Sequence, residues 1–161
     1  DYNMEKELVQ AYTMRITQAN RTELVVILYE LVLHDLNKAK EQIDFHGQEE
    51  YQKVLVHACK CVNELIVTLD FQYEVSYDLM RLYRYVNECI TKCKVAPDMK
   101  LFESAINTIS GLQKAFMEVA KQDRSGPVMQ NTEQVYAGLT YSKGSLNESL
   151  INQSYDRGFR A

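Results

Sequence analysis

The residues best suited to chemistry are the cysteines and histidines. His57 and Cys61 are four residues apart in one predicted helix, and Cys89 and Cys93 have the same spacing in another. If those helices pack face to face, the four side chains could form a Cys3His zinc site. The alternative is that the thiols fill a helix interface, because cysteine is small and often buried. We favour packing, predict no metal ligand and expect reduced thiols, since all four cysteines lie in helical patterns rather than in the loops of a small secreted chain.

The spacing of the histidines does not indicate catalysis. A di-iron bundle needs Glu-x-x-His pairs on inward faces, whereas Glu30 and His34 are four residues apart. A phosphotransfer histidine needs small neighbours, but bulky or charged residues follow both His34 and His57. The chain has no Gly-rich phosphate loop and no nucleophile elbow. We therefore predict a binding protein that is not an enzyme and uses no cofactor, and we interpret each histidine as a surface or boundary residue.

Composition limits the possible partners. The 161 residues are 46% apolar and 25% charged, which is enough for one core and a polar surface. The net charge of −4 leaves no basic field for a nucleic acid backbone. The longest apolar run, residues 24–33, is interrupted by Glu30 and is far short of the ~20 residues that span a bilayer. With no basic-then-apolar signal pattern at its start, we expect a cytoplasmic protein without membrane insertion.

The helix that positions the rest is predicted from Asn20 to Ile43. Asn20 followed by Glu23 is a capping-box pattern, which marks a helix start. Residues 24–33 are apolar on nearly every side of this helix, whereas a single core needs only one stripe. We therefore expect this helix to be central and to contact neighbours on two sides.

Three further helices are predicted, at about residues 49–70, 76–94 and 98–123. Leu82 in the second of these and Val119 in the third fall on the predicted inward stripes. The connections are short, so we predict an all-α fold, an antiparallel up-down-up-down four-helix bundle spanning residues 20–123.

The two ends of the chain differ from the bundle. In residues 1–19, Leu8, Tyr12 and Ile16 share a helical stripe, but Thr13 and Thr17 favour an irregular joint. We expect an N-terminal arm that is mobile and partly helical, with apolar residues lying on the bundle surface. Residues 124–161 are rich in Asn, Gln, Ser and Gly, so we predict a partly disordered, flexible C-terminal extension. A second capping-box pattern at Ser145 predicts one short helix within it.

Residues 16–31 read ITQANRTELVVILYEL. They resemble the entry segment V-x-T-A-S-P-E-E-L-x-x-M-L-Y-D-G of the FliS family of flagellar secretion chaperones, with matches at Ala19, Glu23, Leu24, Leu28 and Tyr29. Residues 58–70 are similar to the family pattern A-x-x-x-I-x-E-L-x-x-S-L-D, and residues 79–87 to L-x-x-L-Y-x-Y-M-N. The resemblance covers about residues 12–121. It departs from the family at Arg21, where the family has proline, and at Leu31, where it has a small residue.

The resemblance implies a small cytoplasmic helical bundle that binds the C-terminal segment of flagellin. Such a chaperone keeps flagellin from polymerising prematurely and delivers it to the flagellar export apparatus, with no cofactor. The residues we assign to partner binding are Tyr12, Ile16, Leu24, Ile27, Leu28, Tyr29, Leu79, Leu82, Tyr83 and Tyr85. We keep two alternatives: a generic helical adaptor for another amphipathic partner, and a metal-binding bundle.

Overall fold

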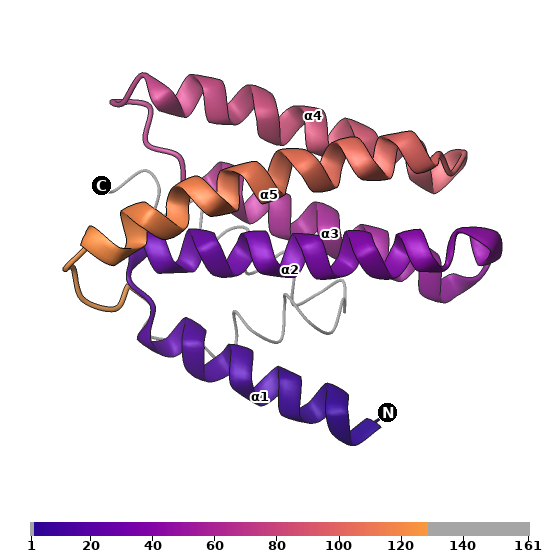
Figure 1. Cartoon of the computed structure of the whole chain (residues 1–161), viewed down its shortest axis with the longest axis horizontal. Coiled ribbons are helices and arrows are strands. Elements are labelled where there is room, and N and C mark those ends of the chain that lie inside the picture. The colour runs from indigo at the N-terminus through magenta and orange to yellow at the C-terminus, as the bar shows by residue number, and fades with distance from the viewer. Residues whose placement is uncertain (1, 129–161) are drawn as a thin grey trace.

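The described chain folds into a helical bundle. The computed structural model describes residues 2–128 and contains α1 (Tyr2–Gln18), α2 (Arg21–Glu41), the short 3-10 helix η1 (Ile43–Phe45), α3 (Glu49–Val67), α4 (Val75–Val95) and α5 (Met99–Gln122). No strand occurs among these residues. Helix α2 packs against α3 and α5, and α4 packs against the same two helices. Figure 1 shows α1 on the far side of α2 from α4. The predicted all-helical bundle is confirmed.

Helix α2 is the central element, as its sequence predicted. It begins with the predicted capping box: Asn20 Oδ1 accepts a hydrogen bond from the Glu23 amide at 2.9 Å, and Glu23 Oε1 accepts one from the Asn20 amide at 3.4 Å. Every residue from Leu24 to Tyr29 is buried. Because α2 contacts α1, α3 and α5, its wide apolar half is covered on more than one side. The expectation of contacts on two sides is confirmed.

The irregular joint predicted ahead of α2 is limited to two residues, and the expectation that Thr13 and Thr17 make it irregular was wrong. Residues 2–18 form one continuous helix, and the chain leaves helical geometry only at Ala19 and Asn20. The threonines do not break α1, because the Thr13 hydroxyl donates to the Val9 carbonyl at 2.8 Å and the Thr17 hydroxyl to the Thr13 carbonyl at 2.7 Å. Ile16 is fully buried, so α1 reaches the core itself instead of only lying on its surface.

The joint between α1 and α2 is held by the residues that follow α5. Asp123 is the C-cap of α5; its carboxylate accepts from the Thr22 hydroxyl at 2.6 Å, and its carbonyl accepts from Asn20 Nδ2 at 3.2 Å. Hydrogen bonds from Ser125 and from Thr22 lower the pKa of Asp123 to about 2. The Val128 amide donates to the Ala19 carbonyl at 3.3 Å. The rest of the predicted extension, with the predicted helix at Ser145, lies outside the described residues.

The other predicted helices are present, with small differences. Helix α3 ends at Val67 rather than near Asp70, because Thr68 donates to the Leu65 carbonyl through both its amide and its hydroxyl, after which the chain turns. Two residues predicted to face inward are exposed: Leu82 is 38% exposed and Val119 is 52% exposed. Both lie at the margin of their stripes, and neither belongs to the core or to the partly buried residues packed against it.

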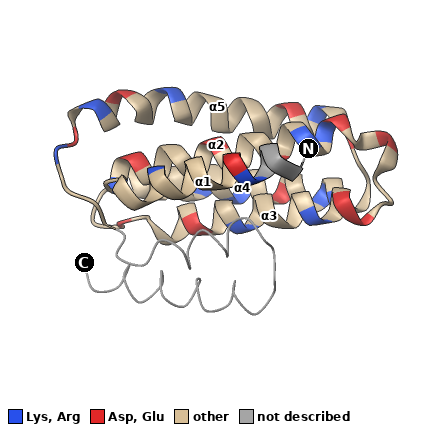
Figure 2. Ribbon diagram, turned by 90° about the horizontal axis from the view of Figure 1, so that it is seen from below, with Lys and Arg blue, Asp and Glu red and all other residues tan. Residues whose placement is uncertain are grey.

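None of the described helices is both long enough and apolar enough to cross a membrane. Figure 2 shows acidic and basic residues interspersed along the described ribbon, without a large face of one sign. This distribution agrees with the small net charge of −4, and it offers no basic surface for nucleic acid.

The joint generates a first prediction. Asn20→Ala should lower the free energy of unfolding by about 1–2 kcal/mol, because it removes the acceptor of the capping box and the donor to Asp123 together. Urea denaturation followed by circular dichroism measures the change. Thr17→Ala is the control, since this exposed hydroxyl bonds only within its own helix and should change the same quantity by less than about 0.5 kcal/mol. Equal effects of the two substitutions would contradict the assigned role of the cap.

Candidate partner-binding site

A cluster of polar side chains connects α1 to α2. Glu30, in the middle of α2, accepts two hydrogen bonds from the Arg15 guanidinium, at 2.5 and 2.8 Å. The Tyr12 hydroxyl donates to Glu30 at 3.4 Å, and the Arg15 guanidinium lies 5.5 Å from the centre of the Tyr12 ring. Tyr12 and Arg15 are three residues apart, which places both on the face of α1 that meets α2. We call Tyr12, Arg15 and Glu30 the latch.

The latch is only partly shielded from water. The side chains of Arg15 and Glu30 are 47% and 26% exposed. The hydrogen bond to Glu30 raises the pKa of Arg15, while burial and the nearby Glu30 charge raise the pKa of Tyr12. Both groups therefore keep their ordinary protonation states at neutral pH. An ion pair this exposed contributes about 0.2–1 kcal/mol, so the latch orients α1 without fixing it strongly.

A second polar contact lies inside the bundle, where a tyrosine of α2 meets one of α4. The hydroxyls of Tyr29 and Tyr83 are 2.6 Å apart, and both side chains are buried. The Phe116 ring of α5 meets the Tyr29 ring edge-on, with 5.7 Å between ring centres. Burial raises the pKa of Tyr83 to about 12 and that of Tyr29 above its usual range. Both hydroxyls stay protonated, so either can donate its hydrogen bond to the other.

The ten predicted partner-binding residues divide by exposure. Seven are buried in the core: Ile16, Leu24, Ile27, Leu28, Tyr29, Leu79 and Tyr83. Tyr12 is half-buried in the latch. Only Leu82 and Tyr85, on α4, are open to solvent, at 38% and 40% exposure. The structure does not bring the ten residues together on one surface, and their role in partner binding stays a prediction.

Sequence reasoning missed an apolar surface between α3 and α4. Phe71, Tyr73, Val75 and Tyr77 are all exposed, and the rings of Phe71 and Tyr77 lie 5.1 Å apart. The segment is ordered by hydrogen bonds to Asp70, whose carbonyl accepts from the Ser76 hydroxyl at 2.6 Å. The signal was present as alternating large apolar residues in FQYEVSY, residues 71–77, which we read only as a short connection and the first residues of the next helix.

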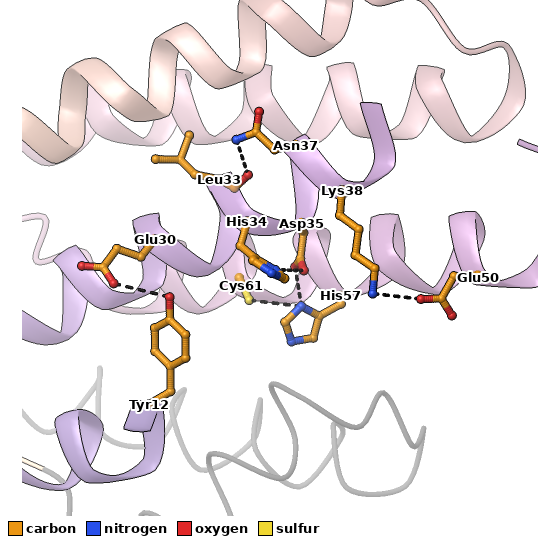
Figure 3. Close-up of polar contacts among 10 residues, drawn as sticks. All are labelled: Tyr12, Glu30, Leu33, His34, Asp35, Asn37, Lys38, Glu50, His57 and Cys61. Atoms are coloured by element: carbon orange, nitrogen blue, oxygen red, sulfur yellow. Dashed lines mark hydrogen bonds and ion pairs between the residues drawn. The ribbon is translucent and has the colours of Figure 1, made fainter. Parts of the chain in front are cut away.

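Another missed feature is a buried cluster between α2 and α3. The interpretation of His57 as a surface or boundary residue was wrong, because it is only 8% exposed and is hydrogen-bonded through Nδ1 to Asp35 of α2. Cys61 Sγ lies 4.0 Å from the same nitrogen (Figure 3). The predicted alternative of a Cys3His set does not form among the described residues, where the group of possible metal ligands is Asp35, His57 and Cys61. Cys89 and Cys93 are buried free thiols, as packing requires.

Comparison with models of protein families gives a match. The family model described as "Flagellar protein FliS" matches residues 4–123, which is most of the 161-residue chain. No curated protein matches the chain. The matched range begins inside α1 and ends at the C-cap of α5, so it includes the latch, the Tyr29–Tyr83 contact and the whole helical bundle.

The tyrosine contact generates a second prediction. Tyr83→Phe should lower the free energy of unfolding by about 1–3 kcal/mol, because it leaves the buried Tyr29 hydroxyl without a partner. The double variant Tyr29→Phe, Tyr83→Phe should cost less than the sum of the two single changes, since no hydroxyl is then left unpaired. Urea unfolding of the three variants measures the coupling. Tyr77→Phe, at a 54% exposed position, is the control and should be near neutral; strict additivity would show that the hydroxyls are not coupled.

Proposed function

This chain belongs to the FliS family of flagellar chaperones, and from that membership we propose that it binds the C-terminal segment of flagellin in the cytoplasm. By covering that segment it prevents premature polymerisation, and it then delivers flagellin to the flagellar export apparatus. The chain acts by binding, without a reaction or a cofactor. The terminal segment is an amphipathic chain that otherwise assembles with its own kind, so its apolar face must be covered by helix surface.

The observation that best supports this proposal is the way α1 covers α2. Ile16 and Ala19 are buried at the joint, while the latch, one turn earlier, is partly exposed. Farther toward the N-terminus Leu8 is 43% exposed, and Figure 1 shows the two helices diverging in that direction. A helix attached chiefly at one end can leave an apolar neighbour at modest cost. Release of α1 would make part of α2 accessible to an amphipathic partner.

We also propose a division of the chain that follows from this role. Residues 1–19 act as an arm, residues 20–123 as the bundle, and residues 124–161 as an extension. Within the bundle we take α2 to α5 to alternate in direction, up-down-up-down, because residues 68–74 and 96–98 are short connections. The arm lies against the bundle in the free protein and rearranges when flagellin binds. Tyr12 and Ile16 then contact flagellin directly.

A binding experiment tests the proposed function. Titration calorimetry of the full chain with the C-terminal segment of flagellin should show a 1:1 complex. Its negative heat-capacity change should correspond to more buried surface than the ~1,600 Å² of an ordinary interface, because a partner that folds on binding wraps widely. The matched control is a peptide of the same composition in scrambled order. Absence of both heat and co-elution would favour the alternative of a generic helical adaptor.

The arm generates a third prediction. Tyr12→Ala combined with Ile16→Ala should weaken flagellin binding by more than about 1.4 kcal/mol, a factor of ten, if these side chains contact flagellin. Glu30→Gln is the matched comparison, because it weakens the latch while keeping both apolar side chains. It should leave the affinity unchanged or raise it up to about fivefold, the equivalent of an exposed ion pair. Circular dichroism verifies that each variant is folded. Unchanged or tighter binding by the double variant would mean that the arm is a cover only.

A further inference from the structure

The cluster of Asp35, His57 and Cys61 is the least expected feature of the core. Helix α3 supplies His57 and Cys61, whose spacing of four residues places the imidazole and the thiol on one face. Helix α2 supplies the carboxylate of Asp35, which contacts His57 Nδ1 directly. One ligand atom from each of the three residues lies within 4.8 Å of the other two. Figure 3 shows the three side chains converging between the helices, with His34 beside Asp35.

The cluster is not a complete ion pair. A charged imidazolium has two N–H groups, and each needs an acceptor when it is buried. His57 Nδ1 contacts Asp35, but His57 Nε2 is buried and has no hydrogen-bond partner among residues 2–128. A neutral imidazole avoids that cost, yet it does not balance the charge of the buried Asp35 carboxylate. The Asp35–His57 contact alone therefore leaves either a polar group or a charge incompletely satisfied.

We propose that Asp35, His57 and Cys61 form a binding site for a divalent cation of the zinc type. Carboxylate oxygen, imidazole nitrogen and thiolate sulfur together form a set that Zn²⁺ accepts, at about 2.0–2.3 Å from the ion. Ligand atoms on one tetrahedral ion are then ~3.4 Å apart. Cys61 Sγ is 4.0 Å from His57 Nδ1, and all three ligand atoms lie within 4.8 Å of one another, so binding requires only small side-chain shifts. The ion takes the place of the hydrogen that joins His57 Nδ1 to Asp35. From a neutral imidazole that proton moves to Nε2, and from an imidazolium it leaves to solvent; the Cys61 thiol also releases its proton to solvent.

Three protein ligands leave one position of a tetrahedral ion free, and His34 lies beside the cluster. His34 Nδ1 lies 3.8 Å from the other oxygen of Asp35, and its side chain is 52% exposed. This residue therefore stands between the buried cluster and solvent, where it can guide the ion inward and serve as a fourth ligand. The bound ion would tie α2 to α3 by direct bonds and stabilise the folded state over the unfolded state. The site is separate from the latch, and its test requires no flagellin.

Cobalt is the probe for this site, because a Co²⁺–thiolate bond absorbs in the near ultraviolet. The full metal-free chain, titrated with Co²⁺, should develop that band at one equivalent, and added Zn²⁺ should abolish it. Cys61→Ser should abolish the band, and Asp35→Asn should weaken cobalt binding at least tenfold. Cys89→Ser is the matched control, since Cys89 is a buried free thiol outside the cluster, and it should retain the band.

Three outcomes would overturn the proposal. These are no band with the wild-type chain, a band that survives Cys61→Ser, and a band that Cys89→Ser removes. If circular dichroism shows that Cys61→Ser does not fold, X-ray absorption of the wild-type chain loaded with Zn²⁺ decides instead. The proposal requires one sulfur ligand at about 2.3 Å with nitrogen and oxygen ligands at about 2.0–2.2 Å. A shell without sulfur, or with more than one sulfur, would exclude this ligand set.

Discussion

The constraint on which the structure depends is the apolar circumference of the first half of α2. Residues 24–29 are all buried, so this half cannot be satisfied by a single neighbouring helix. Helices α3 and α5 cover most of it, and α1 covers a smaller further part. The cost of exposing apolar surface, ~25 cal/mol per Å², is what keeps α1 against the bundle, more than its partly exposed ion pair. The segment before Asn20 is therefore part of the core at its C-terminal end and only loosely attached beyond the latch.

Buried polar groups then fix how the helices face one another. The hydrogen bond between Tyr29 and Tyr83 joins α2 to α4. The Tyr51 hydroxyl donates to the Cys93 carbonyl at 2.7 Å, which joins α3 to α4. The contact between Asp35 and His57 joins α2 to α3. Each contact forms in only one rotational setting of its helices, because a rotation of either helix would leave a buried group unpaired. Apolar packing holds the bundle together, and these contacts select among the packings that apolar area alone would allow.

Features encoded locally could be predicted from the sequence. The capping box at Asn20 depends on residues within one turn, and the width of the apolar surface of α2 depends on one helix, so both were evident. Features that depend on two distant segments could not. The contact of His57 requires Asp35 from another helix, and the exposure of Leu82 depends on how far the neighbouring helices cover the margin of its stripe. Thr13 and Thr17 misled because their hydroxyls can either end a helix or bond within it, and the sequence does not distinguish the two.

A chaperone for an amphipathic segment faces two opposed requirements, and the attachment of α1 addresses both. Apolar surface must be covered while no partner is bound, and it must become available at a cost that the partner can offset. The joint is stabilised by the burial of Ile16, by the helix cap at Asn20 and by the hydrogen bonds that Asp123 accepts. The latch at Glu30 is half open to water, and beyond it Leu8 is exposed. Opening that begins at the N-terminal end therefore breaks the weakest contacts first and leaves the cap at Asn20 and the hydrogen bonds to Asp123 intact. On this account the capped joint is needed so that the arm remains an aligned helix throughout, able to return to α2 when the partner leaves.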